Sequence, residues 1–164
     1  MSAYLADNRF ERGRNYVTYL RAGNPELRVE TGRYEGARRA DRRPTIPREE
    51  RTCLFCFGAV EDEKHFMLDC PLYGEARAEL QATFLNVTRG KRPVNLASPS
   101  MSADAKLSFL IGDGVEGFVK KVRVQLNSAV KRFVMSAFAE RRRWFSSGED
   151  GQLAVAFLVA SAAA

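Results

Sequence analysis

The stretch TCLFCFGAVEDEKHFMLDCP, residues 52–71, contains all three cysteines and the only histidine of this 164-residue chain. These four side chains follow one another with the spacing Cys53-x2-Cys56-x8-His65-x4-Cys70. Three cysteines and one histidine are a common ligand set for tetrahedral zinc, and a C-x2-C pair places two sulfurs on one ion from a single turn. The spacing therefore predicts one structural Zn²⁺ ion bound by Cys53, Cys56, His65 and Cys70.

The chain between the last two ligands has to turn both of them toward the same ion. Residues five apart on an α-helix lie about 140° apart around its axis, so His65 and Cys70 would not both face the ion from an unbroken helix. Pro71 favours the end of one helix at Cys70 and the beginning of the next helix just after it. A break at Cys70-Pro71 is therefore expected.

Two other interpretations of residues 52–71 are open. In the first, the cysteines and the histidine are ordinary core residues and bind no metal. In the second, the ion is catalytic and Glu61, Asp62 or Glu63 acts as a base beside it. Four good ligands leave no open position, which favours a structural ion, and the three carboxylates suit the N-terminus of a helix before His65.

The rest of the chain predicts mainly helices. Apolar spacing predicts amphipathic helices over three ranges: 72–86, 105–111 with Ser102 or Asp104 as its cap, and 115–145. Residues 2–22 are loosely helical in pattern, whereas the alternation of Leu27, Val29 and Thr31 predicts a short strand over residues 27–34. We therefore expect a mainly α fold, or α+β with few strands, in which a small zinc-stapled hairpin or knuckle precedes amphipathic helices.

Four segments follow from these patterns. They are an N-terminal helix, short strand and basic linker (1–51), the CCHC zinc unit with its following helix (52–86), a C-terminal helical part (87–145) and an apolar, alanine-rich tail (146–164). The longest apolar run, residues 153–164, is shorter than the roughly 20 residues that a bilayer-spanning helix needs. We expect no membrane span. The tail is either a frayed end or an extra core helix, or it makes a weak contact to a membrane or a partner.

The charge of the chain indicates a class of binding partner, and its N-terminal residues and cysteine count indicate a cellular location. The chain carries a net charge of +6 with a pI of about 9.5, and basic soluble proteins tend to bind polyanions. Residues 1–20 are rich in charged side chains and show no apolar core of a signal peptide, and an odd cysteine count argues against a disulfide framework. The expected location is intracellular, either cytoplasmic or nuclear.

Two groups of basic residues are candidates for phosphate contacts. They are Arg38, Arg39, Arg42 and Arg43 in a loop over residues 35–51, and Lys120, Lys121, Lys131 and Arg132 on the polar face of the 115–145 helix. The alternative is that both groups are only a solvated surface. Phe55 and Phe57 have two candidate roles as well, which are stacking on an unpaired base and packing beneath the metal site.

Nothing else in the sequence indicates catalysis. With His65 assigned to the metal, no histidine remains for a Ser-His or Cys-His pair. The chain also has no phosphate-binding glycine loop of the P-loop or dinucleotide kind. We therefore predict that the protein is not an enzyme.

Three segments together resemble a known family. The segments VETGRY (29–34), IPREERTCLFC (46–56) and EDEKHFMLDCPLYGEAR (61–77) resemble the C-terminal, zinc-binding region of reverse transcriptases from non-LTR retrotransposons. A weaker similarity extends through KLSFLI (106–111) to Ala137, Phe138 and Arg141, so that the resemblance covers roughly residues 25–143. It implies a module that follows the polymerase and helps to hold template RNA or target DNA. The aromatic-x-Asp-Asp signature of the polymerase is absent from this sequence, so polymerase activity is not implied.

Three hypotheses for the function follow. The first is a zinc-stabilised module that binds RNA or DNA through non-specific phosphate contacts. The second is a structural zinc domain that mediates protein–protein interaction, which is favoured by the net charge of −3 of residues 52–71 (one lysine against four carboxylates). The third is a decayed fragment with no selected function. Salt separates the first two, because phosphate binding weakens steeply as the salt concentration rises.

Overall fold

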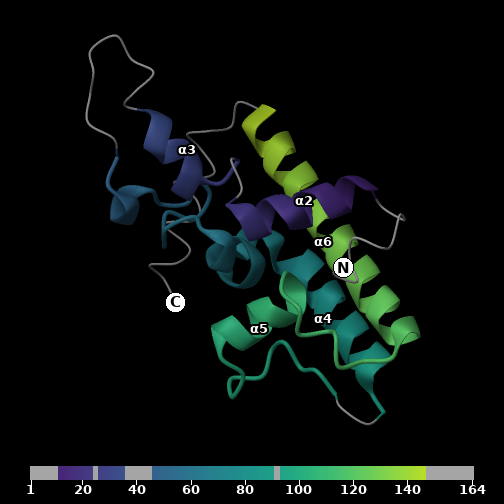
Figure 1. The fold of residues 1–164 in the computed structure, drawn as a ribbon. Coiled ribbons are helices and arrows are strands. Elements are labelled where there is room, and N and C mark those ends of the chain that lie inside the picture. Colours follow the sequence, from purple (N-terminus) through teal and green to yellow (C-terminus); the bar gives the residue numbers. More distant parts are fainter. Residues whose placement is uncertain (1–10, 24–25, 36–45, 91–92, 147–164) are drawn as a thin grey trace. The chain divides into compact units, whose positions relative to one another are not determined.

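The computed structural model describes residues 11–23, 26–35, 46–90 and 93–146, and this part of the chain is mainly helical, as the sequence predicts (Figure 1). The α-helices are α2 (Glu11–Ala22), α3 (Arg28–Glu35), α4 (Gly74–Thr88), α5 (Ala103–Leu110) and α6 (Lys120–Ser146). Three short helical turns accompany them: η1 (Arg48–Glu50), η2 (His65–Asp69) and η3 (Pro71–Tyr73). Across the described ranges, the only isolated β-bridge joins Thr52 and Val60 in antiparallel fashion, and no helix is long and apolar enough to cross a membrane.

The chain forms two compact units, each of which is described by itself. The first unit comprises the described residues of Met1–Ala22 and Tyr73–Phe138, and the second comprises those of Gly23–Leu72 and Ala139–Ala164. Helix α6 therefore contributes residues to both units. The segment from residue 146 to the C-terminus, predicted as an apolar tail, lies outside the described residues beyond Ser146.

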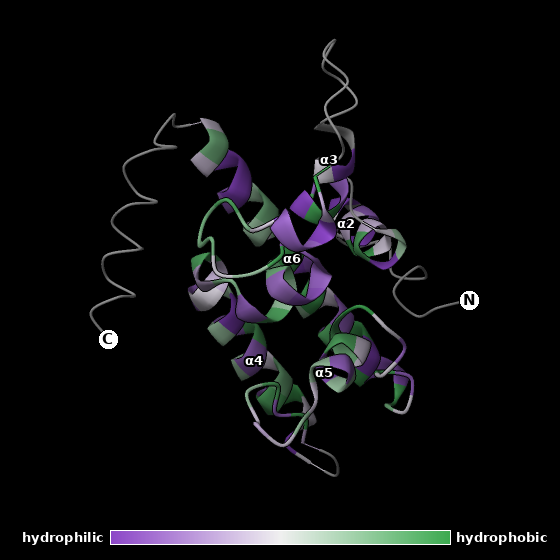
Figure 2. Cartoon of the chain, turned by 90° about the vertical axis from the view of Figure 1, so that its left-hand side faces the viewer, coloured by the Kyte–Doolittle hydropathy of each residue, from purple (hydrophilic) through white to green (hydrophobic). Residues whose placement is uncertain are grey.

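Helix α6 supplies much of the core of the first unit. Its buried apolar residues recur with the spacing of one helix face: Leu126, Ala129, Val130, Phe133, Val134, Ala137 and Phe138. Both hydrophobic and hydrophilic colours mark α6 in Figure 2, as expected for an amphipathic helix. The predicted helix over 115–145 is confirmed for most of its length, but α6 begins only at Lys120. Val119, predicted to lie on the apolar face, is 71% exposed.

The two shorter predicted helices of the first unit are also confirmed, with small shifts at their ends. The 72–86 prediction corresponds to η3 followed by α4, and Leu80 and Phe84 are buried as its spacing requires. The 105–111 prediction corresponds to α5, where Ser102 Oγ accepts a hydrogen bond of 3.2 Å from the Ala105 backbone N–H. This bond satisfies a backbone donor that the first turn leaves free, so Ser102 is the N-cap.

Gly13 explains why Lys131 is buried in the first unit. A Cβ atom at Gly13 would lie 2.7 Å from the Cβ of Lys131, so the absent side chain lets α2 approach α6 closely. Lys131 is fully buried as a result. The prediction that Lys131 belongs to an exposed basic face is therefore wrong.

The strand predicted over residues 27–34 is also wrong, because this segment forms α3. Leu27 and Val29 are both buried, as the alternating pattern requires, but the backbone N–H groups of Glu30 and Thr31 both bond to the Leu27 carbonyl oxygen. Gly32 lies so close to Arg51 that a Cβ atom would be 2.7 Å from the Arg51 Cγ. The pattern predicted burial correctly and secondary structure incorrectly.

Candidate metal centre

The four predicted ligands come together in the second unit. All four ligand atoms lie within 4.8 Å of one another. The Sγ atoms of Cys53 and Cys70 are 3.9 Å apart, and Cys56 Sγ is 3.3 Å from His65 Nε2. Zinc bonds of about 2.3 Å to sulfur and about 2.0–2.1 Å to nitrogen place tetrahedral ligands about 3.5–3.8 Å apart. The geometry therefore fits a metal ion held by one imidazole and by the sulfurs of three cysteines that form no disulfide.

A short hairpin positions the first two ligands. The Cys53 N–H donates to the Ala59 carbonyl oxygen at 2.8 Å, beside the bridge between Thr52 and Val60. The turn between the two bridged residues closes where the Phe57 N–H donates to the Cys53 carbonyl oxygen at 2.9 Å. This turn holds the Cys53 and Cys56 thiols on one side, which is how a C-x2-C pair presents two sulfurs to one ion.

A π-helical turn, η2, positions the other two ligands. The Cys70 N–H donates to the His65 carbonyl oxygen at 2.8 Å, a hydrogen bond across five residues. A π-helix has more residues per turn than an α-helix, so residues five apart return nearly to the same side. Cys70 is extended and Pro71 begins η3, which confirms the predicted break at this position. The sequence pattern did not predict the π turn itself.

Two of the three carboxylates before His65, Glu61 and Asp62, have different roles. Asp62 acts as a helix cap, since its Oδ1 accepts the His65 N–H at 2.9 Å. Glu61, by contrast, is 1% exposed and forms a buried ion pair with Arg141. The expectation that Glu61 merely adds charge to a helix N-terminus is therefore wrong. The ion pair also occupies both of its carboxylate oxygens, which does not suit a general base.

Burial and mutual contact favour the protonated thiols of Cys53 and Cys56 when no metal is bound. A hydrogen bond with Cys70 and then burial raise the pKa of Cys53 well above its ordinary value of 9.0. Burial also raises the pKa of Cys56. Burial lowers the pKa of His65, but the contact with Cys53 and the charges of Glu61 and Asp69 outweigh it, so that this pKa is raised above 6.5. A metal ion would have to displace protons from this site as it binds.

The residues predicted to contact nucleic acid differ in whether the structure describes them and in whether they are exposed. Arg38, Arg39, Arg42 and Arg43 lie outside the described residues. In the first unit Lys120, Lys121 and Arg132 are exposed, whereas Lys131 is buried. Of the two aromatic candidates, Phe55 is buried against Trp144 and Phe145 and Phe57 is 43% exposed.

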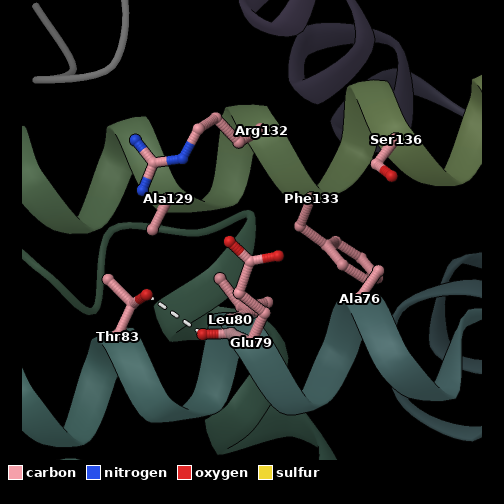
Figure 3. A pocket seen from close by; sticks show the side chains of 8 residues that line it. All are labelled: Ala76, Glu79, Leu80, Thr83, Ala129, Arg132, Phe133 and Ser136. Atoms are coloured by element: carbon pink, nitrogen blue, oxygen red, sulfur yellow. Dashed lines mark hydrogen bonds between the residues drawn. The ribbon is translucent and has the colours of Figure 1, made fainter.

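A cavity of about 180 Å³ lies between α4 and α6 of the first unit (Figure 3). Its lining comprises Ala76, Glu79, Leu80, Thr83, Ala129, Arg132, Phe133 and Ser136. In Figure 3 the Phe133 ring points from α6 toward α4, and the Glu79 carboxylate points from α4 toward α6. None of these lining residues is a cysteine or a histidine, so this cavity offers no second set of soft metal ligands.

No protein-family model, curated protein or solved structure matches the chain. The resemblance to the C-terminal region of reverse transcriptases therefore stays a prediction from the sequence motifs.

Proposed function

We propose that the protein is a zinc-binding module in which one structural Zn²⁺ ion is held by Cys53, Cys56, His65 and Cys70. The convergence of all four ligand atoms within 4.8 Å carries this proposal. Three thiols and an imidazole are ligands that zinc prefers, and three of the four residues are buried. With four protein ligands a tetrahedral ion has no position left for a substrate, which supports a structural role and no enzymatic one.

The test is the zinc content of the purified protein, compared with that of two variants. We expect about one zinc ion per chain in the wild type and almost none in His65→Ala, because three ligands bind zinc far more weakly than four. Lys64→Ala is the matched control, since Lys64 is exposed and directly precedes the ligand. A folded wild-type protein without bound zinc would overturn the proposal.

We further propose that the module binds nucleic acid, as the resemblance to reverse transcriptases implies. The net charge of +6 and the exposed side chains of Lys120, Lys121 and Arg132 support this partner. The burial of Lys131 removes one of the expected contacts. The exposed Phe57 and the negative charge of residues 52–71 favour the alternative, which is a protein partner.

The salt dependence of binding separates these two partners. We expect binding to single-stranded RNA or DNA to weaken as the salt concentration rises. The double variant Lys120→Ala/Lys121→Ala should reduce the steepness of the plot of log binding constant against log salt concentration by about 1.4, because each lost phosphate contact accounts for about 0.7. Lys64→Ala, which changes an exposed lysine of the acidic segment, leaves the slope unchanged. Absence of salt-dependent binding would favour the protein partner.

A further inference from the structure

The buried Glu61 carboxylate lies directly behind the metal ligands of the second unit. Its Oε1 atom is 3.9 Å from Cys53 Sγ, and its Oε2 atom accepts the Arg28 N–H at 2.9 Å. The Glu61 backbone belongs to the same hairpin as Cys53, because its N–H donates to the Arg51 carbonyl oxygen at 3.0 Å. A fixed carboxylate next to a thiolate ligand is repulsive unless a cation compensates for it.

Arg141, from the last turns of α6, provides that cation. Its guanidinium binds both carboxylate oxygens of Glu61 and also donates to the Glu26 carbonyl oxygen at 2.9 Å. Both side chains of the ion pair are almost fully buried, so solvent screens the pair very little. The guanidinium carbon also lies 5.4 Å from the centre of the Phe55 ring.

Aromatic contacts join the same two parts of the second unit. Phe55 lies between the ligands Cys53 and Cys56 in sequence, and its ring centre is 4.5 Å from that of Trp144 and 5.6 Å from that of Phe145. The turn that carries two ligands therefore packs on the last turns of α6. Trp144 is the only tryptophan of the chain, so the tryptophan fluorescence reports on the surroundings of this residue, which include Phe55 and Phe145.

We propose that Arg141 is a positioning residue of the metal centre: its charge offsets the Glu61 carboxylate and the thiolate ligands, and metal binding in turn fixes residues 139–146 of α6 against the hairpin. With one Zn²⁺, three thiolates and a neutral imidazole, the centre carries −1, and Glu61 brings the cluster to −2. Arg141 returns it to −1. Loss of this cation would leave two adjacent negative groups buried without compensation, which weakens metal binding.

This inference rests on the proposed zinc site, and the experiment separates the two. Zinc affinity is measured by chelator competition, and Trp144 fluorescence is recorded with and without zinc, for wild type, Arg141→Met, Glu61→Gln and the double variant. Arg143→Met is the matched control, because Arg143 lies two residues away with a side chain that is 73% exposed. Zinc content of the wild type tests the proposed function by itself.

We expect Arg141→Met to bind zinc about 10–100-fold more weakly, the range typical of outer-shell partners of metal ligands. Arg143→Met should match the wild type, and the double variant should regain most of the lost affinity because the carboxylate charge is gone as well. Zinc removal from the wild type should change the Trp144 fluorescence. If Arg141→Met does not fold, the zinc affinity of the double variant is compared with that of the wild type. Similar affinities support the inference, and a loss of affinity in the double variant contradicts it.

Three results would overturn the inference while leaving the zinc site intact. The first is equal zinc affinity in Arg141→Met and Arg143→Met. The second is a Trp144 fluorescence signal that does not respond to zinc. The third is a double variant that binds zinc as weakly as Arg141→Met or clearly more weakly than the wild type. The last result would show that the pair acts through packing and not through charge.

Discussion

Phe57 is the residue of the hairpin whose backbone least suits its side chain. It directly follows the ligand Cys56 and has a φ of 52°, in the left-handed region that favours glycine. This conformation costs a residue with a side chain about 1–2 kcal/mol, and the Phe57 ring is too exposed to recover much of it by burial. Such an exposed aromatic ring in a strained position suits contact with a partner.

Substitution of Phe57 tests whether its backbone conformation is strained. We expect Phe57→Gly to raise the free energy of unfolding of the zinc-loaded protein by roughly 0.5 kcal/mol, because relief of strain exceeds the added chain entropy of glycine. Phe57→Ala, which removes the ring but keeps the strain, should give no such gain. Urea denaturation followed by Trp144 fluorescence measures both. A loss of stability in Phe57→Gly would show that the ring supports the fold.

The raised pKa values of the buried thiols lead to a prediction about how the zinc affinity depends on pH. Since the pKa of Cys53 is raised above 9.0, protons compete with the metal throughout the neutral range. We expect the apparent zinc affinity to rise by about tenfold or more per pH unit between pH 6 and 8, with more than one proton released. Chelator competition at several pH values measures the slope. An affinity that does not change with pH would contradict a site of buried thiols.

The same shift has the opposite consequence for the metal-free protein. The unfolded chain loses the Cys53 proton near pH 9, whereas the folded protein retains it because the pKa is raised. The contribution of this thiol to stability is therefore complete below pH 9 and is lost as the pH rises above it.

At the scale of elements, the sequence predicted which four side chains come together in the cysteine–histidine cluster, and it predicted one element wrongly. The ligand set followed from local spacing, and the helices followed from apolar periodicity. Leu27 and Val29 fitted a strand as well as a short helix, because an alternating pattern over so few residues does not separate the two. The structure forms α3 there, with its N-terminal N–H groups bound to Glu61.

Contacts between distant residues could not have been predicted from spacing. Glu61 and Arg141 are 80 positions apart, and no local pattern connects them. The burial of Lys131 could not be predicted from spacing either, because it depends on the close approach of Gly13 in another helix. Polar residues at helix positions indicate an exposed face only when no neighbouring element covers them.

Gly32 gives a prediction for α3. A Cβ atom at this position would lie 2.7 Å from Arg51 Cγ, and Arg51 is held by hydrogen bonds to the carbonyl oxygens of Val29 and Ile46. We expect Gly32→Ala to destabilise the second unit by about 1–3 kcal/mol, the usual cost of overpacking. Gly74→Ala is the control, since a Cβ atom there would meet nothing within 4 Å and α4 would gain roughly 0.5–1 kcal/mol.

Urea denaturation followed by Trp144 fluorescence distinguishes these two glycines, because Trp144 belongs to the second unit together with Gly32. Equal stability of Gly32→Ala and the wild type would mean that Arg51 moves aside without cost. That result would also weaken the view that its two hydrogen bonds fix the position of α3.

At the scale of the whole molecule, the two units differ in how their cores are made. The first unit buries large apolar side chains of α2, α4 and α6, including Leu20, Phe84 and Phe138. The described core of the second unit contains three of the four candidate metal ligands, because Cys53, His65 and Cys70 are buried there together with residues such as Phe66. A small core of this kind commonly depends on a metal for its stability.

We therefore expect zinc removal to affect the two units unequally. Chelation should shift the Trp144 fluorescence toward that of an exposed indole, while far-UV circular dichroism retains most of its helical signal, since α2, α4, α5 and most of α6 belong to the first unit. His65→Ala without chelator should behave in the same way, which controls for effects of the chelator. Simultaneous loss of both signals would mean that the metal stabilises the entire described chain as one cooperative structure. Retention of both would mean that the second unit folds without metal, and that the ligand residues then contribute to its core mainly as ordinary buried side chains.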